Sequence, residues 1–219
     1  KSQFYLPEGM IYLDGNSLGP LPKRAQERIQ HTLNKEWGEM LVTGWNKAGW
    51  MDQPNKVGDR IAKLIGAASK TVTVGDTLSI KIFQALASAT NYQKKRKVLL
   101  TDSSNFPSDI YAAQGLVNMI QADHELKIVS TDNLIENINE NIAAVFFTEV
   151  DYKTGRRYDA KKIIKAAKQN GSLVILDLAH SAGAIDTNLT ELDVDLAVGC
   201  TYKYLNGGPG SPAFIYVNP

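Results

Sequence analysis

Two ionisable side chains stand directly after apolar runs of the sequence. Asp177 follows residues 173–176, and Lys203 follows the run 196–198 and precedes the glycine-rich residues 206–210. A carboxylate at the end of a buried strand needs a cationic partner or several hydrogen-bond donors. An amine in a dry site can attack an aldehyde. The pair could therefore hold a cofactor that has a ring nitrogen and an aldehyde, although an N-cap, an ion pair and a surface lysine are the structural alternatives.

Pyridoxal 5′-phosphate (PLP) is a cofactor with both features. Asp177 would pair with its protonated ring nitrogen, because a pyridinium is a far better electron sink than a neutral pyridine. Lys203 would bind its aldehyde carbon as a Schiff base. His180 and Tyr202 flank these two candidates, but each of them taken singly is more often structural than catalytic.

Two predicted helix starts offer further contacts. Asp76-Thr-Leu-Ser79 leads from a strand into a helix, whose free N–H groups would suit a phosphate. Ordinary capping by Asp76 or Thr77 is the alternative, and neither a Walker nor a G-x-G-x-x-G spacing is present. Phe106 precedes Pro107, which opens another helix. The Phe106 ring either lies over an aromatic cofactor or packs into the core.

Alternating strands and helices must position these side chains. Apolar runs predict strands at residues 72–74, 97–100, 126–129, 143–147, 173–176, 196–198 and 213–217. Helical patterns lie at residues 79–87, 107–119, 134–138 and 160–169, after one helix through Ala25, Ile29, Leu33 and Trp37 and another around Val57, Ile61, Leu64 and Ile65. This order predicts an α/β fold with a mostly parallel sheet sandwiched by helices. Such sheets bind ligands beyond the carboxyl ends of their strands, where Thr148, Asp177 and Lys203 would gather.

Composition narrows the class of protein. The 219 residues are 43% hydrophobic, and 24 Lys and Arg nearly balance 23 Asp and Glu, so we expect no nucleic-acid partner. No apolar run reaches the roughly 20 residues that cross a bilayer, and no secretory signal opens the chain. Cys200 is the only cysteine, which fits a small buried side chain in a cytoplasmic protein. We predict no metal site.

Longer motifs resemble the kynureninase family over nearly the whole chain. They are Tyr12-Leu-Asp-Gly-Asn-Ser-Leu-Gly19, Gly44-Trp-Asn-Lys-Ala-Gly-Trp50, Phe106-Pro-Ser-Asp109, Asp151-Tyr-Lys-Thr-Gly155, Asp177-Leu-Ala-His-Ser-Ala-Gly183 and Gly199-Cys-Thr-Tyr-Lys-Tyr-Leu-Asn-Gly-Gly-Pro-Gly210. The segment Tyr-Lys-Tyr-Leu-Asn from Tyr202 is specific, because related desulfurases and aminotransferases place other residues around the lysine.

The resemblance implies the large domain of a fold-type-I PLP enzyme that hydrolyses L-kynurenine, or 3-hydroxykynurenine, to anthranilate, or 3-hydroxyanthranilate, and L-alanine in tryptophan catabolism. It also implies a homodimer. Residues 1–50 would form an N-terminal segment with the first helix, and residues 51–219 a PLP-binding large domain that is incomplete at its C-terminal end. Family chains are about twice as long, so we expect a fragment without the small C-terminal domain, inactive alone.

The same resemblance implies roles for matching positions. Lys203 would carry PLP and move protons, Asp177 would pair with the ring nitrogen, and Tyr202 would assist and reach the phosphate. Trp45 would border the aromatic ring of the substrate. The remaining implied cofactor contacts are Leu78 and Ser79 at the phosphate, Phe106 on the ring face, and Pro107, Ser108, Asp109, Thr148 and His180 around the ring.

Two other interpretations remain open. Another PLP enzyme of this fold, such as a cysteine desulfurase or a small-amino-acid aminotransferase, would share Asp177 and Lys203. A desulfurase would carry a catalytic cysteine in a later loop, and its lysine usually follows a histidine rather than Tyr202. A non-catalytic scaffold domain is the third possibility, against which the retention of both Asp177 and Lys203 argues.

Overall fold

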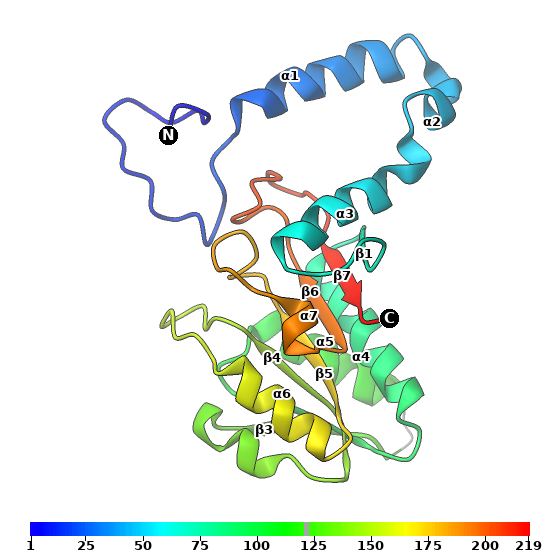
Figure 1. Cartoon of the computed structure of the whole chain (residues 1–219), viewed down its shortest axis with the longest axis vertical. Coiled ribbons are helices and arrows are strands. Elements are labelled where there is room, and N and C mark those ends of the chain that lie inside the picture. Colours follow the sequence, from blue (N-terminus) through cyan, green and yellow to red (C-terminus); the bar gives the residue numbers. More distant parts are fainter. Residues whose placement is uncertain (121–122) are drawn as a thin grey trace.

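The computed structural model describes residues 1–120 and 123–219. In this part of the chain a seven-stranded sheet has the order β1-β7-β6-β5-β4-β2-β3 (Figure 1). Strands β3, β2, β4, β5 and β6 are parallel neighbours, whereas β7 is antiparallel to both β6 and β1. The mostly parallel sheet is therefore confirmed. The strands are β1 (Val72–Val74), β2 (Val98–Asp102), β3 (Glu125–Val129), β4 (Ile142–Thr148), β5 (Leu173–Asp177), β6 (Leu196–Gly199) and β7 (Phe214–Val217).

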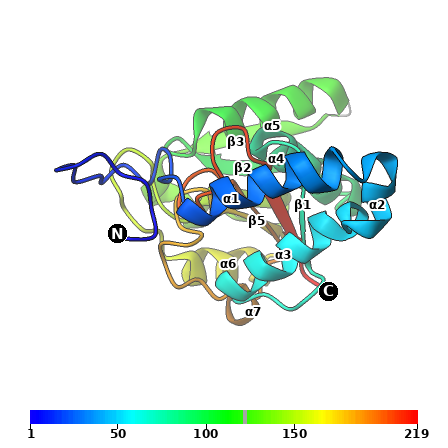
Figure 2. The same cartoon turned by 90° about the horizontal axis from the view of Figure 1, so that it is seen from above.

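Helices cover both faces of this sheet. Figure 2 shows α4 and α5 on one side of it and α6 and α7 on the other. Phe146 and Phe147, adjacent in β4 and each 1% exposed, belong to two separate apolar cores on opposite faces. This explains why the buried strands read as continuous apolar runs. The helices are α1 (Lys23–His31), α2 (Gly44–Lys47), α3 (Gln53–Leu64), α4 (Leu78–Tyr92), α5 (Pro107–Ile120), α6 (Ala160–Gln169) and α7 (Leu189–Leu192).

The helix predicted at residues 134–138 is wrong. The chain forms two 3₁₀ turns there, Thr131–Asn133 and Ile135–Asn137, and Ile138 is already extended. So short a segment gains too few hydrogen bonds to offset helix nucleation. The side-chain amide of Asn137 also donates to the Asn133 carbonyl at 2.9 Å, which favours a turn. Leu134 is buried as the helix pattern required, but it reaches the core from a turn.

The N-terminal part of the chain leads away from the sheet and back onto it. In Figure 1, α1 and α2 form an arm beside the body, and α3 returns to pack on β1. The predicted first helix is present, but it changes after His31 into a wider π-helix, Thr32–Trp37. Among the described residues, no helix combines the length and apolarity that a membrane crossing requires.

Candidate functional site

The carboxyl ends of the parallel strands meet at one edge of the sheet. Thr148 at the end of β4 lies opposite Asp177 at the end of β5. The Glu149 amide donates to the Asp177 carbonyl at 2.9 Å, and the Leu178 amide donates to the Val198 carbonyl of β6 at 2.8 Å. The lysine segment, residues 200–208, follows β6 and carries Lys203. The structure thus brings these predicted side chains to the same edge, because parallel strands end together.

Lys203 is enclosed at this edge although it carries an amine. Its side chain is buried, and its Nζ atom lies 2.6 Å from Nε2 of His180. The rings of Phe106 and Tyr202 have their centroids 5.6 Å and 5.7 Å from Nζ. Within the described part of the chain, no carboxylate lies within 4.0 Å of this amine. The amine is therefore held by an imidazole and aromatic faces rather than by an ion pair.

His180 is a neutral partner for this amine. Burial, and next the positive charge of Lys203, lower the pKa of His180 to about 4. A neutral imidazole that accepts at Nε2 carries its own proton at Nδ1. Nδ1 is buried without a hydrogen-bond partner in the described residues. His180 can therefore accept a hydrogen bond from Lys203 at Nε2 and still present a donor elsewhere in the site.

Two buried carboxyl groups stand close to each other beside the lysine. Burial raises the pKa of Asp177 to about 6, while the Ala179 amide, which donates to Oδ1 at 2.8 Å, and Lys203 oppose that rise. Burial, followed by the charge of Asp177, raises the pKa of Asp109 well above its usual value. Burial thus disfavours the charged form of both carboxyl groups, and the charge of Asp177 adds to this effect at Asp109. Their Oδ2 atoms lack partners among the described residues.

A cluster of rings adjoins the lysine, and one of its members escaped prediction. The Phe106 ring meets the Tyr152 ring edge to face at a centroid distance of 4.9 Å, and lies 6.1 Å from the His180 ring. Tyr152 also stacks on His180 at 6.3 Å. The resemblance pointed to the motif that contains Tyr152 but gave this residue no role. Its aromatic type within a turn motif was the available signal.

The predicted phosphate contacts open α4. Leu78 and Ser79 are its first two residues, after Thr77, whose hydroxyl accepts from the Ile80 amide at 3.5 Å. Since β1 is separated from β6 by one antiparallel strand, β1 points the same way as β6 and α4 begins at the edge that carries Lys203. A helix start with free amides at that edge suits an anion.

The other predicted ring contacts lie at two element ends. Pro107 is the first residue of α5, and the Ser108 hydroxyl lies 3.3 Å from Oδ1 of Asp109. Thr148 is buried at the end of β4, where its hydroxyl donates to the Val150 carbonyl at 2.9 Å. The α5 residues thus belong to the cluster around Asp177, whereas the Thr148 hydroxyl is engaged by its own loop.

Trp45 is the predicted residue that the structure leaves apart. It lies on α2, is 52% exposed, and meets Trp50 edge-on at 5.8 Å. Both indoles line a cleft of about 850 Å³. Thr201 and Leu205, from the two sides of Lys203 in the chain, line the same cleft. Trp45 therefore faces the lysine segment across open space and does not join the cluster around Lys203.

The N-terminal segment supports the lysine segment, which sequence reasoning missed. The Gly19 amide donates to the Tyr202 carbonyl at 2.8 Å, and the Asn206 amide group donates to the Pro20 carbonyl at 3.0 Å. A Cβ atom at Gly19 would overlap the carbonyl oxygen of Lys203. The glycine is therefore needed for this close approach. The motif around Gly19 was the signal, but nothing local connected it to Lys203.

Comparisons with known proteins identify the family of the chain. The Aminotransferase class-V family matches residues 11–216. A kynureninase of Pseudomonas fluorescens is 47% identical over 224 residues, which cover 100% of this chain and 54% of that protein. A kynureninase of Burkholderia mallei (strain SAVP1) is 46% identical over 222 residues, which cover 99% of this chain and 53% of that protein. The chain thus spans about half the length of the curated relatives it matches.

Solved structures support the fold. The cysteine desulfurase CsdA of Escherichia coli aligns with a TM-score of 0.81 at 18% identity, covering 99% of this chain and 56% of that one. A NIFS-like protein aligns with a TM-score of 0.78 at 17% identity, covering 95% and 59%. Enzymes of the family depend on PLP. Because the family match spans nearly all of the sequence, the chain belongs to the class-V aminotransferases.

Proposed function

We propose that this chain is the cofactor-binding part of a kynureninase, which hydrolyses L-kynurenine to anthranilate and L-alanine with the help of PLP. The observation that carries the proposal is a buried lysine, Lys203, hydrogen-bonded to the neutral imidazole of His180. It lies at the same sheet edge as the buried carboxyl of Asp177, whose Oδ2 atom has no hydrogen-bond partner in the described residues. Relatives that match the chain from end to end bear the name kynureninase. Bound PLP would supply an electron sink for carbanion chemistry.

Unpartnered polar atoms fit such a cofactor. Buried atoms without a hydrogen-bond partner in the described residues include Asp177 Oδ2, Asp109 Oδ2, His180 Nδ1 and Ser181 Oγ. Leaving such atoms unpaired is costly, so a polar ligand that meets them is strongly favoured. A ring with a protonated nitrogen and an oxygen substituent meets this requirement, and a purely apolar ligand would not.

Each residue at the edge then has a defined task. Nζ of Lys203 would be the point of covalent attachment, and as a free amine it would carry protons to and from substrate carbon. His180, neutral at physiological pH, would accept a hydrogen bond at Nε2 and so orient that amine. Asp177 would hold the positive charge at the ring nitrogen, with the buried Asp109 beside it. The Phe106 ring would cover one face of the cofactor.

The remaining predicted contacts complete this proposal. Leu78 and Ser79 would bind the phosphate at the start of α4, and Tyr202 would reach it from the lysine segment. Trp45 would border the substrate from the cleft that it lines. We also propose the division into residues 1–50 and 51–219, a homodimer and a cytoplasmic location. The last cofactor contacts in this proposal are Pro107, Ser108 and Thr148.

Cys200 does not have the environment of a desulfurase nucleophile. Cys200 is buried, and burial raises the pKa of its thiol. A desulfurase nucleophile needs the thiolate, which this environment disfavours. Cys200 instead behaves as the small buried side chain that its sequence context suggested, with Sγ 3.8 Å from the Ala179 carbonyl oxygen.

Absorbance and product formation test the proposal in the full-length protein. After loading with PLP and removal of the free cofactor, the wild type should retain an absorption band in the visible or near ultraviolet and should release fluorescent anthranilate from kynurenine. Lys203→Ala should abolish both signals. Lys162→Ala is the control and should retain them, because the Lys162 side chain is 75% exposed and pairs with Asp159. A wild type that stays colourless, or that releases sulfide from cysteine in place of anthranilate, would refute the proposal.

A further inference from the structure

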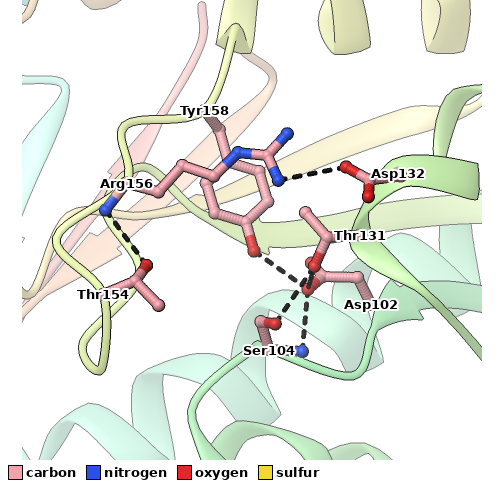
Figure 3. A network of polar contacts seen from close by, with 7 residues as sticks. All are labelled: Asp102, Ser104, Thr131, Asp132, Thr154, Arg156 and Tyr158. Atoms are coloured by element: carbon pink, nitrogen blue, oxygen red, sulfur yellow. Dashed lines mark hydrogen bonds and ion pairs between the residues drawn. The ribbon is translucent and has the colours of Figure 1, made fainter.

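A buried carboxylate behind the site has three donors on one oxygen. Asp102, at the end of β2, is fully buried, and its Oδ1 atom accepts from the Ser104 amide, the Thr131 hydroxyl and the Tyr158 hydroxyl, each at 2.9 Å (Figure 3). Its Oδ2 atom is buried without a partner in the described residues. Asp102 does not contact Lys203, so this network needs a different explanation.

The Tyr158 hydroxyl is protonated and serves as a hydrogen-bond donor in the network. Burial, and further the nearby charge of Asp102, raise the pKa of its phenol, so the hydroxyl keeps its proton. Its ring packs on Phe147 of the core at a centroid distance of 6.0 Å. Its amide donates to the Glu149 carbonyl at 2.9 Å, which closes the loop of residues 150–157 on itself. The hydroxyl therefore reaches Asp102 from a rigid position.

Through its donors, Asp102 joins two loops whose aromatic rings also touch each other beside Lys203. Ser104 lies in the loop between β2 and α5, where Oδ1 of Asn105 accepts from the Phe106 amide at 2.8 Å. Tyr158 ends the loop that carries Tyr152. The Phe106 and Tyr152 rings touch at 4.9 Å, and the Phe106 ring lies 5.6 Å from the Lys203 amine. The two loops are thus joined twice, once by rings at the site and once by Asp102 behind it.

We propose that Tyr158 and Asp102 are positioning residues, whose hydrogen bond holds the two loops in register and so fixes the Phe106 ring over Lys203. The inference rests on the proposed function, because the purpose of that ring is to cover a bound cofactor. Neither residue touches the reacting atoms. Their effect passes from Asp102 through the Ser104 amide and Asn105 to Phe106.

Thr90 provides a matched control. Its hydroxyl is buried like that of Tyr158, but it donates to the Leu86 carbonyl at 2.8 Å within α4, apart from the Asp102 network. Tyr158→Phe and Thr90→Val each remove one buried hydroxyl donor with little change in shape. Each variant therefore loses one buried hydrogen bond, and only Tyr158→Phe separates the two loops.

The test compares the two variants in the full-length protein. Tyr158→Phe should weaken PLP binding by about tenfold and alter the visible circular dichroism of bound PLP, since one hydrogen bond to a charged group is lost. Thr90→Val should leave the PLP dissociation constant within about twofold of the wild-type value and keep its dichroism. Thermal unfolding of both variants should show matched folding. Equal effects of the two variants on PLP would overturn the inference and leave the proposed function standing.

A second measurement decides the inference without the cofactor. In the cofactor-free protein, amide hydrogen exchange at residues 103–106 should be faster in Tyr158→Phe than in Thr90→Val, because only the former frees that loop. Equal exchange in the two variants would overturn the inference. If the wild type fails to bind PLP, the proposed function is refuted, and the exchange rates still show whether Tyr158 positions Phe106.

Discussion

The buried Asp177 carboxyl makes the stability of the cofactor-free protein depend on pH. Its pKa is about 6 in the folded chain, mainly through burial, and 3.8 is its ordinary value. The folded state therefore holds a proton that the unfolded chain releases, and stability falls as pH rises from about 4 to about 6. Asp177→Asn removes this titration and keeps an oxygen for the Ala179 amide. Above pH 6 we expect this variant to exceed the wild type by about 2–3 kcal/mol in unfolding free energy.

Urea unfolding of both cofactor-free proteins between pH 4 and pH 7 measures the difference. It should be small at pH 4, grow up to about pH 6 and then level off. A difference independent of pH would show that Asp177 is ionised in the folded state without cost. Asp109 shifts in the same direction, mainly through its own burial, which both proteins share.

At the same scale, local pattern revealed some residues of the site and concealed others. Asp177 and Lys203 were predictable because each ends an apolar run, and a charged group at that place is unusual enough to need a reason. His180 was a candidate only as a neighbour of Asp177. The hydrogen bond between Tyr158 and Asp102 was not predictable, because it joins two loops far apart in the chain through three-dimensional packing.

At the scale of helices and strands, close packing limits which residues can be replaced. Gly58 lies in α3, where a Cβ atom would overlap the carbonyl oxygen of Val72 in β1. Gly115 lies in α5, where a Cβ atom would meet nothing within 4 Å. Gly58→Ala should therefore destabilise the protein by about 1–3 kcal/mol by forcing α3 from the sheet. Gly115→Ala should stabilise it by roughly 0.5–1 kcal/mol, because alanine favours a helix.

Denaturant unfolding of the two variants beside the wild type checks both signs at once. Each substitution adds the same methyl group to a helix interior, so their opposite effects would come from the neighbouring strand alone. A stabilised Gly58→Ala would mean that α3 can move away from β1 without loss.

The presence of an element followed from periodicity wherever it buries its own apolar face, whereas its ends did not: α4, predicted at residues 79–87, runs from Leu78 to Tyr92. All seven predicted strands and the helices at α3, α4, α5 and α6 are present, because each pattern is long enough to specify its packing. The helix prediction for residues 134–138 was wrong because a single buried side chain, Leu134, fits a turn as well as a helix. The π-helix after α1 could not be predicted, because the four-residue spacing of Ile29, Leu33 and Trp37 fits an α-helix as well as the wider helix.

On the scale of the whole molecule, the first twenty residues are attached to the last twenty. Tyr12 donates to the Leu18 carbonyl at 2.7 Å, which shapes the turn before Gly19. The Gly19 amide and the Pro20 carbonyl then bond to Tyr202 and Asn206 on the two sides of Lys203. The lysine segment is therefore fixed by the opposite end of the chain as well as by its own strand.

Asn206→Asp tests this attachment, because it replaces the donor to the Pro20 carbonyl by a carboxylate that repels it. Asn206 has a φ of 58°, and aspartate tolerates that conformation, so the backbone strain is unchanged. Amide exchange at residues 15–22 and at residues 201–208 should accelerate together by about tenfold. Asn218→Asp is the matched control, since it loses a similar bond, to Asp193 at 3.1 Å, at a place without contact to the N-terminal segment. Faster exchange in only one of the two segments would show that they hold their positions independently.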